Sequence, residues 1–203
     1  MIMRKIAVTG TLSSGKSTVC QLFKELGAYV VSADEIVHQL LVSGTKIGQQ
    51  VIDIFGDEIL TNGQIDRSKI AKKAFRDPVL LQALEKLIHP QVRNQIEREY
   101  QCCTIATYPL FVAEIPLLFE TNWDVDYPVT IAVIAKPELC KQRHEKNKNI
   151  SNESDYQQRS KRQLGADEKA CKATYVIYNN GSLEMLRANV ANIFELLTPN
   201  TGV

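Results

Sequence analysis

The chain has 203 residues, of which 44% are hydrophobic, and its 24 basic and 23 acidic residues leave a formal net charge of +1. This composition excludes a disordered chain and is sufficient for the core of one α/β domain with insertions. The small net charge provides no field that would draw the whole molecule to nucleic acid or to a membrane surface, so we expect neither as a partner.

The start of the chain leaves little room for a targeting segment. The glycine-rich stretch begins at Gly10, and no later apolar run approaches the roughly 18 residues of a membrane span. We therefore expect a cytoplasmic protein. The five cysteines show no C-x-x-C spacing and the three histidines are far apart in sequence, so we expect neither a disulfide framework nor a zinc site.

Five short runs rich in β-branched residues predict strands. They lie at residues 5–9, 28–31, 110–115, 129–134 and 174–178. Several are apolar almost throughout, which is typical of parallel strands buried on both faces. Because helical patterns separate them, the order indicates βαβ units and therefore an α/β fold with a doubly wound, parallel, five-stranded sheet.

The first helix is marked by apolar residues at helical spacing. They are Val19, Leu22, Phe23 and Leu26. Gly27 follows at the position of a left-handed C-terminal cap. The pattern predicts a helix that begins within the glycine-rich stretch and ends at Gly27.

Two long connections predict insertions into this fold. Residues 34–109 are far more than one crossover needs, and they contain helical patterns and the turn Asn62-Gly63. We interpret them as an inserted helical lobe that could cover a ligand. Residues 137–172 are polar, and they form either a mobile lid or a solvated pair of helices.

The stretch after the first strand carries the clearest chemical signal. It reads Gly10-Thr11-Leu12-Ser13-Ser14-Gly15-Lys16-Ser17-Thr18 and satisfies the pattern G-x-x-x-x-G-K-[ST], with a strand before it and a helix beginning in it. The glycines allow the backbone N–H groups to point inward at an anion, Lys16 reaches the β- and γ-phosphates, and Ser17 offers its hydroxyl to Mg²⁺. The stretch therefore predicts binding of a nucleoside triphosphate.

A phosphate-binding loop alone does not distinguish a kinase from a GTPase or an ATPase. The nearest approach to the guanine-reading motif N-K-x-D is residues 147–150, where Ile150 stands in place of the carboxylate. This disfavours a GTPase. Glu114, in the third strand, is either the acidic residue of a motor-type ATPase or an ordinary carboxylate near a strand end.

Asp34 closes the second predicted strand. The carboxyl ends of strands converge on the ligand crevice of a doubly wound sheet, so this carboxylate could face the γ-phosphate, accept a proton from an attacking hydroxyl or hold the water shell of a metal. The alternative is a capping box formed by Ser32 and Glu35, which would explain the acidic residues without catalysis. Spacing alone leaves both interpretations open.

Seven short motifs follow one another along the chain. They are residues 9–18 (TGTLSSGKST), 32–34 (SAD), 55–60 (FGDEIL), 63–67 (GQIDR), 84–90 (LEKLIHP), 116–120 (PLLFE) and 179–181 (NNG). Most of them are weak individually, but in this order they are specific. With them the chain resembles the dephospho-coenzyme A kinase family over nearly its full length.

The resemblance implies that ATP phosphorylates the ribose 3′-hydroxyl of dephospho-coenzyme A, the last step of coenzyme A synthesis. It implies a P-loop kinase-like nucleotide-binding core (1–34, 109–136 and 173–203), a helical substrate domain for the CoA moiety (35–108) and a lid (137–172). Another small-molecule or nucleoside-monophosphate kinase, or a regulator that binds nucleotide without catalysis, stays open as an alternative.

The resemblance also assigns roles to residues. Asp34 becomes the base and, with Ser17, a partner of Mg²⁺, while Lys16 and Arg143 become catalytic cations. Substrate contacts are expected from Asp34, Arg67, His89, Arg93, Pro116 and Leu117, adenine neighbours from Gln163 and Asn179, and further lid cations at Arg159 and Arg162. For His89, which precedes Pro90, the alternative is a cap at a helix end; for the lid arginines it is a solvated helix face.

The chain departs from the family pattern at three positions. Thr11 and Ser13 replace two glycines, which we expect to stiffen the loop or restrict its φ angles. Ser32 replaces the first aspartate of D-A-D, which removes one carboxylate from the crevice; we expect Asp34 to suffice, because one proton needs one base.

Cys102-Cys103 has no assigned role, and by default we expect two buried small hydrophobic side chains.

Overall fold

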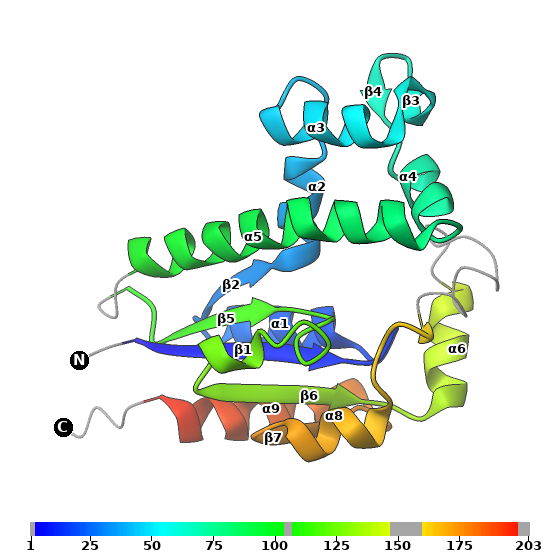
Figure 1. Cartoon of the computed structure of the whole chain (residues 1–203). Coiled ribbons are helices and arrows are strands. Elements are labelled where there is room, and N and C mark those ends of the chain that lie inside the picture. Colours follow the sequence, from blue (N-terminus) through cyan, green and yellow to red (C-terminus); the bar gives the residue numbers. More distant parts are fainter. Residues whose placement is uncertain (1–2, 104–106, 147–159, 199–203) are drawn as a thin grey trace. The chain divides into compact units, whose positions relative to one another are not determined.

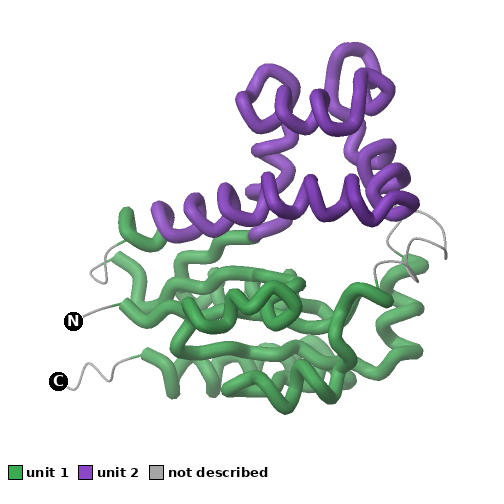
Figure 2. Tube along the Cα trace, in the orientation of Figure 1, with its two compact units in different colours: residues 1–32, 100–203 green, residues 33–99 purple. Residues whose placement is uncertain are grey.

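The structure is a computed structural model that describes residues 3–103, 107–146 and 160–198. Two compact units make up the chain: Met1–Ser32 together with Tyr100–Val203, and Ala33–Glu99 (Figures 1 and 2). None of the helices in the described ranges combines the length and the apolar character that a bilayer crossing needs. The predicted domain boundaries, with a CoA domain and a lid, stay a prediction.

The first unit is built on a five-stranded sheet. Its strands are β1 (Arg4–Gly10), β2 (Tyr29–Ser32), β5 (Leu110–Glu114), β6 (Val129–Ile134) and β7 (Tyr175–Tyr178). Their order is β2-β5-β1-β6-β7 and every neighbouring pair is parallel, which confirms the predicted doubly wound sheet (Figure 1). Because all the strands run the same way, their carboxyl ends meet at one edge, where a ligand site is expected.

The core of this unit lies between the sheet and two helices, α1 (Lys16–Glu25) and α9 (Leu183–Leu197). Phe23 of α1 and Val190 of α9 are fully buried, as are Ile6 and Val8 of the central strand. Gly27 follows α1 with a φ of +98°, which confirms the predicted helix end. The unit also contains α6 (Pro137–Lys146), α8 (Ala166–Lys172) and a short 3₁₀ helix, η2 (Asp124–Asp126).

The second unit is mostly helical. Its elements are α2 (Ala33–Leu40), α3 (Lys46–Phe55), η1 (Asp57–Ile59), β3 (Leu60–Thr61), β4 (Gln64–Ile65), α4 (Arg67–Ala74) and most of α5 (Pro78–Cys102). Side chains cap the starts of α3, α4 and α5. Thr45 accepts from the Gly48 N–H, Asp66 accepts from the Ser68 and Lys69 N–H groups, and Asp77 accepts from the Val79 and Leu80 N–H groups. The Asn62-Gly63 turn joins β3 to β4, as its sequence predicts.

Helix α5 continues through Pro90, so the alternative role of His89, a cap at a helix end, is wrong. A proline inside a helix removes one backbone hydrogen bond and costs roughly 3 kcal/mol. Ile88, Val92 and Ile96 are buried on both sides of Pro90 along the helix, and their packing offsets that cost. His89 therefore lies in a helix interior, one turn before Arg93.

The default expectation for Cys102-Cys103 is also wrong. Cys102 is exposed and Cys103 is only partly buried. Cys102 is the last residue of α5 and Cys103 follows it, beyond the buried positions of the helix, which end at Ile96.

The described part of the predicted lid comprises α6 and residues 160–172; Arg159 and residues 147–150 lie outside the described residues.

Candidate active site

Two glycines of the loop between β1 and α1 stand where no side chain fits. A Cβ atom on Gly10, which has a φ of +152°, would lie 2.2 Å from the carbonyl oxygen of Val133. A Cβ atom on Gly15, which has a φ of +101°, would lie 2.2 Å from Asn179 Nδ2. The loop is therefore held against the ends of β6 and β7 at the carboxyl edge of the sheet, as its glycine spacing predicts.

The start of α1 is suited to an anion. Gly15 occupies the N-cap without a side-chain hydrogen bond to the helix, and the first turn contains no acidic residue. The N–H groups of this turn and the positive end of the helix dipole therefore face the loop. The Lys16 side chain, only 8% exposed, places its Nζ 2.9 Å from the Thr11 carbonyl oxygen, to which it donates. The loop N–H groups, the helix start and the ammonium are therefore together suited to a phosphate group.

Ser13 takes a left-handed conformation, with a φ of +59°, at a position where the family pattern has glycine. A side chain there does not prevent the loop from adopting this φ, but it adds a strain of about 1 kcal/mol. We predict that Ser13→Gly raises the free energy of unfolding by about 1 kcal/mol and Tm by about 2–4 °C. Thermal and urea unfolding would check this. Thr11→Gly is the matched control, because Thr11 is not among the residues with positive φ, and an equal gain there would contradict the strain at Ser13.

Glu114 belongs to the site, although the sequence left its role open. It is the last residue of β5, only 9% exposed, and its Oε1 accepts a hydrogen bond of 2.8 Å from Ser17 Oγ. In the sheet register Glu114 stands opposite Val8 of β1 and Ser32 of β2. A hydroxyl and a carboxylate so close together are oxygen donors of the kind that Mg²⁺ prefers. The signal in the sequence was an acidic residue at the end of an apolar strand.

Two buried thiols lie near the loop. Burial, and next the negative charge of Glu114, raise the pKa of the Cys20 thiol well above its ordinary value, although Lys16 opposes this shift. Burial also raises the pKa of Cys140, against a hydrogen bond from Thr11 and the charge of Arg143. Both thiols therefore stay protonated near neutral pH and are poor nucleophiles.

Arg143 and Asn179 hold the loop by hydrogen bonds to its backbone. Arg143 Nη1 donates to the Ser14 carbonyl oxygen at 3.3 Å, and its Nη2 donates to the Asn179 carbonyl oxygen at 3.0 Å. Asn179 Nδ2 donates to the same Ser14 oxygen at 2.9 Å. The structure thus brings two predicted site residues, from α6 and from the end of β7, to the phosphate loop. Whether they also touch the nucleotide stays a prediction.

The segment after β5 also adjoins the end of β1. Thr9, which directly precedes Gly10, donates from Oγ1 to the Pro116 carbonyl oxygen at 3.1 Å. Pro116 and Leu117 are partly exposed, whereas the next two residues, Leu118 and Phe119, are buried. The two residues predicted to contact substrate are therefore accessible at the start of this turn.

The remaining predicted site residues are divided between the units. Asp34 is exposed in the first turn of α2, Arg67 is the first residue of α4, and His89 and Arg93 lie on α5, all within Ala33–Glu99. Gln163 belongs to the first unit, as does Arg162, which is partly buried. The buried Oε1 of Gln163 accepts no hydrogen bond from the described residues, so it is a group that a ligand could satisfy.

Comparisons with known proteins concern the family and the fold of the chain. The family model for dephospho-CoA kinase matches residues 4–185. The dephospho-CoA kinase of Protochlamydia amoebophila is 44% identical over 197 residues, which cover 96% of this chain and 97% of that protein. A crystal structure of a Thermus thermophilus protein has a TM-score of 0.83 at 32% identity and covers 98% of this chain and all of that chain.

A dephospho-CoA kinase from Campylobacter jejuni has a TM-score of 0.65 at 24% identity, covers 98% of this chain and 99% of that chain, and supports the fold alone. The family assignment depends on sequence, because the family model spans most of the chain and the Protochlamydia relative aligns over nearly all of it. The chain therefore belongs to the dephospho-CoA kinase family, as its ordered motifs predict.

Proposed function

We propose that this chain transfers the γ-phosphoryl group of ATP to the ribose 3′-hydroxyl of dephospho-coenzyme A, which yields coenzyme A and ADP. The observation that carries this proposal is the phosphate loop with Lys16 and Ser17, in a chain that belongs to the dephospho-CoA kinase family. ATP and dephospho-coenzyme A are its proposed substrates. The cytoplasmic location stays a prediction.

The reaction asks for positioning and for neutralisation of charge on the phosphoryl oxygens. The N–H groups at the start of α1 and the Lys16 ammonium would bind the β- and γ-phosphates. Arg143 uses two donors on carbonyl oxygens of Ser14 and Asn179, and a guanidinium has five N–H donors, so others are left for a phosphoryl oxygen. We therefore keep Arg143 as a catalytic cation that also orients the loop.

Ser17 and Glu114 would hold Mg²⁺ together with phosphate oxygens of the nucleotide. Their hydroxyl and carboxylate are already within 2.8 Å of each other, and Mg²⁺ is commonly bound by one or two carboxylates plus substrate phosphates. When bound, Mg²⁺ supplies positive charge at the β- and γ-phosphate oxygens. Asp34 is proposed to accept the proton of the 3′-hydroxyl and, with Ser17, to be a partner of Mg²⁺.

Arg67 is proposed to bind the acceptor, with His89, Arg93, Pro116 and Leu117. Arg67 is the exposed first residue of α4. A positive charge at the start of a helix interacts unfavourably with the helix dipole, so helix stability does not explain an arginine at this position. We predict that Arg67→Ala raises the KM for dephospho-coenzyme A about tenfold, as expected for the loss of a charge-assisted hydrogen bond, without lowering Tm. Steady-state kinetics with each substrate varied would check this, and a KM that rises for ATP instead would contradict it.

The proposed function is tested by a coupled kinase assay of the purified chain with ATP and Mg²⁺. Dephospho-coenzyme A, nucleoside monophosphates and shikimate are offered as separate acceptors, with Lys16→Met as the negative control. Of these acceptors, we expect only dephospho-coenzyme A to cause release of ADP. We expect no ADP release by Lys16→Met with any acceptor. Preference for another acceptor would indicate a different small-molecule kinase, and ATP binding without transfer to any acceptor would indicate a regulator.

A further inference from the structure

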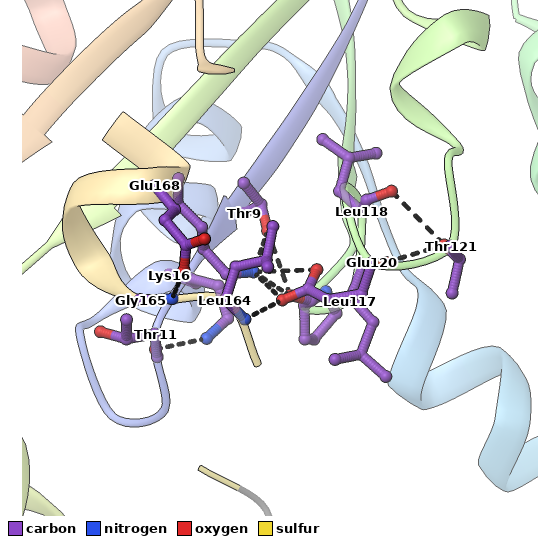
Figure 3. Close-up of polar contacts among 12 residues, drawn as sticks. Thr9, Thr11, Lys16, Leu117, Leu118, Glu120, Thr121, Leu164, Gly165 and Glu168 are labelled. Atoms are coloured by element: carbon purple, nitrogen blue, oxygen red, sulfur yellow. Dashed lines mark hydrogen bonds and ion pairs between the residues drawn. The ribbon is translucent and has the colours of Figure 1, made fainter. Parts of the chain in front are cut away.

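Lys169 of α8 is a lysine with no exposed surface. Its Nζ donates to the Pro116 carbonyl oxygen at 2.8 Å and to Thr9 Oγ1 at 3.2 Å. The same ammonium forms an ion pair of 2.9 Å with Glu120, whose side chain is 12% exposed. Figure 3 shows Thr9 and Glu120 within one group of polar contacts. An ammonium group has three N–H donors, and here three different residues accept hydrogen bonds from it.

The partners of Lys169 come from segments that lead into the candidate active site. Thr9 immediately precedes Gly10 of the phosphate loop, and Pro116 begins the turn that carries Leu117. Glu120 lies in the same turn, and its Oε1 also accepts a hydrogen bond of 2.7 Å from the Leu164 N–H, just before α8 (Figure 3). One buried cation therefore joins the end of β1, the turn after β5 and the start of α8.

Stability is a weak explanation for this pair. A buried ion pair loses in desolvation about what it gains in attraction, and apolar side chains of similar size are often as stable. Consistent with this cost, burial lowers the pKa of Lys169, although the hydrogen bond and charge of Glu120 oppose the shift. What the pair supplies is a fixed geometry, because three directed hydrogen bonds allow only one arrangement of the three segments.

We propose that Lys169 and Glu120 form a positioning pair that fixes Pro116 and Leu117 relative to the phosphate loop for binding of the acceptor. Neither residue is assigned contact with substrate. This inference rests on the proposed function, since it takes Pro116 and Leu117 as contacts of dephospho-coenzyme A. It adds to the site two residues that lie outside the phosphate loop and act through the backbone of the turn.

The test uses the double variant Lys169→Met/Glu120→Gln. Lys169→Met alone would leave a largely buried carboxylate without its cation, so a loss of activity could not be separated from a loss of folding. In the double variant both charges are gone, Thr9 can still donate to Pro116, and the amide oxygen at position 120 can still accept from Leu164. We expect it to fold and to raise the KM for dephospho-coenzyme A about tenfold, while the KM for ATP changes less than about twofold.

The matched control is Arg187→Gln/Glu25→Gln, which removes an exposed ion pair between α9 and α1 of the same unit. It should leave kcat and both KM values unchanged. If the Lys169→Met/Glu120→Gln variant shows a shift in Tm but unchanged kinetics, or equal changes in both KM values, the positioning role is overturned. Failure of the proposed function is a separate result, because the unmodified chain would then not phosphorylate dephospho-coenzyme A.

Discussion

Replacing Asp34 by asparagine is expected to lower kcat by a factor of about 10² to 10⁴, the usual contribution of a general base. The asparagine amide has nearly the same size as the carboxylate, but it cannot accept the proton of the 3′-hydroxyl. The KM for ATP should stay nearly unchanged, because the phosphate loop is formed by residues 10–15 and α1, and Asp34 is an exposed residue of α2. Steady-state kinetics and calorimetric binding of ATP would measure both quantities.

The neighbouring residue offers a matched control for this variant. Glu35 is also exposed in the first turn of α2, where each carboxylate stabilises the helix by about 0.3–1 kcal/mol. Glu35→Gln and Asp34→Asn should therefore lower the stability by similar amounts, but only Asp34→Asn should lower kcat. Equal kcat values in the two variants would return Asp34 to a role at the helix start, which is the alternative that the capping-box pattern suggested.

Local patterns were enough to predict the sheet and the phosphate loop. β5 and β6 are apolar almost throughout, apart from Glu114 and Thr130, because both faces of a central parallel strand are buried. Such a run predicts a buried strand even when its neighbours in the sheet are not known. The loop is equally local, since Gly10, Gly15, Lys16 and Ser17 lie within eight residues of one another. Ser17 and the loop glycines therefore lie where the sequence placed them, between β1 and α1.

Residues whose roles depend on distant contacts could not be assigned in this way. Glu114 meets Ser17 because β5 lies beside β1, although about a hundred positions separate the two residues. Lys169 lies in a polar stretch, and its sequence gives no sign that the side chain is buried. The burial comes from packing against the end of β1 and the turn after β5. The continuation of α5 through Pro90 likewise depends on burial of Ile88 and Val92, which outweighs the local signal of proline.

Glu114→Gln is the second variant with a large expected effect. The amide can still accept the hydrogen bond from Ser17, but it removes the negative charge that would hold Mg²⁺. We expect kcat to fall about 10²- to 10³-fold, as when one electrostatic contact to the transition state is lost, and half-saturation to require about tenfold more Mg²⁺. Magnesium titrations of activity and of ATP binding by calorimetry would measure the two effects separately.

A double-mutant cycle with Ser17→Ala distinguishes a shared metal site from two independent roles. If Ser17 and Glu114 hold the same ion, each single variant raises the Mg²⁺ requirement and the double variant adds little to the larger effect, because coupled residues are not additive. The register of the sheet strengthens this expectation, because Ser32 stands opposite Glu114. At position 32 the family pattern has an aspartate, whereas this chain has a hydroxyl. Binding of Mg²⁺ should therefore depend more on Glu114. Additive effects, or an unchanged Mg²⁺ requirement in Glu114→Gln, would assign the metal to other ligands and leave Glu114 as a structural partner of Ser17.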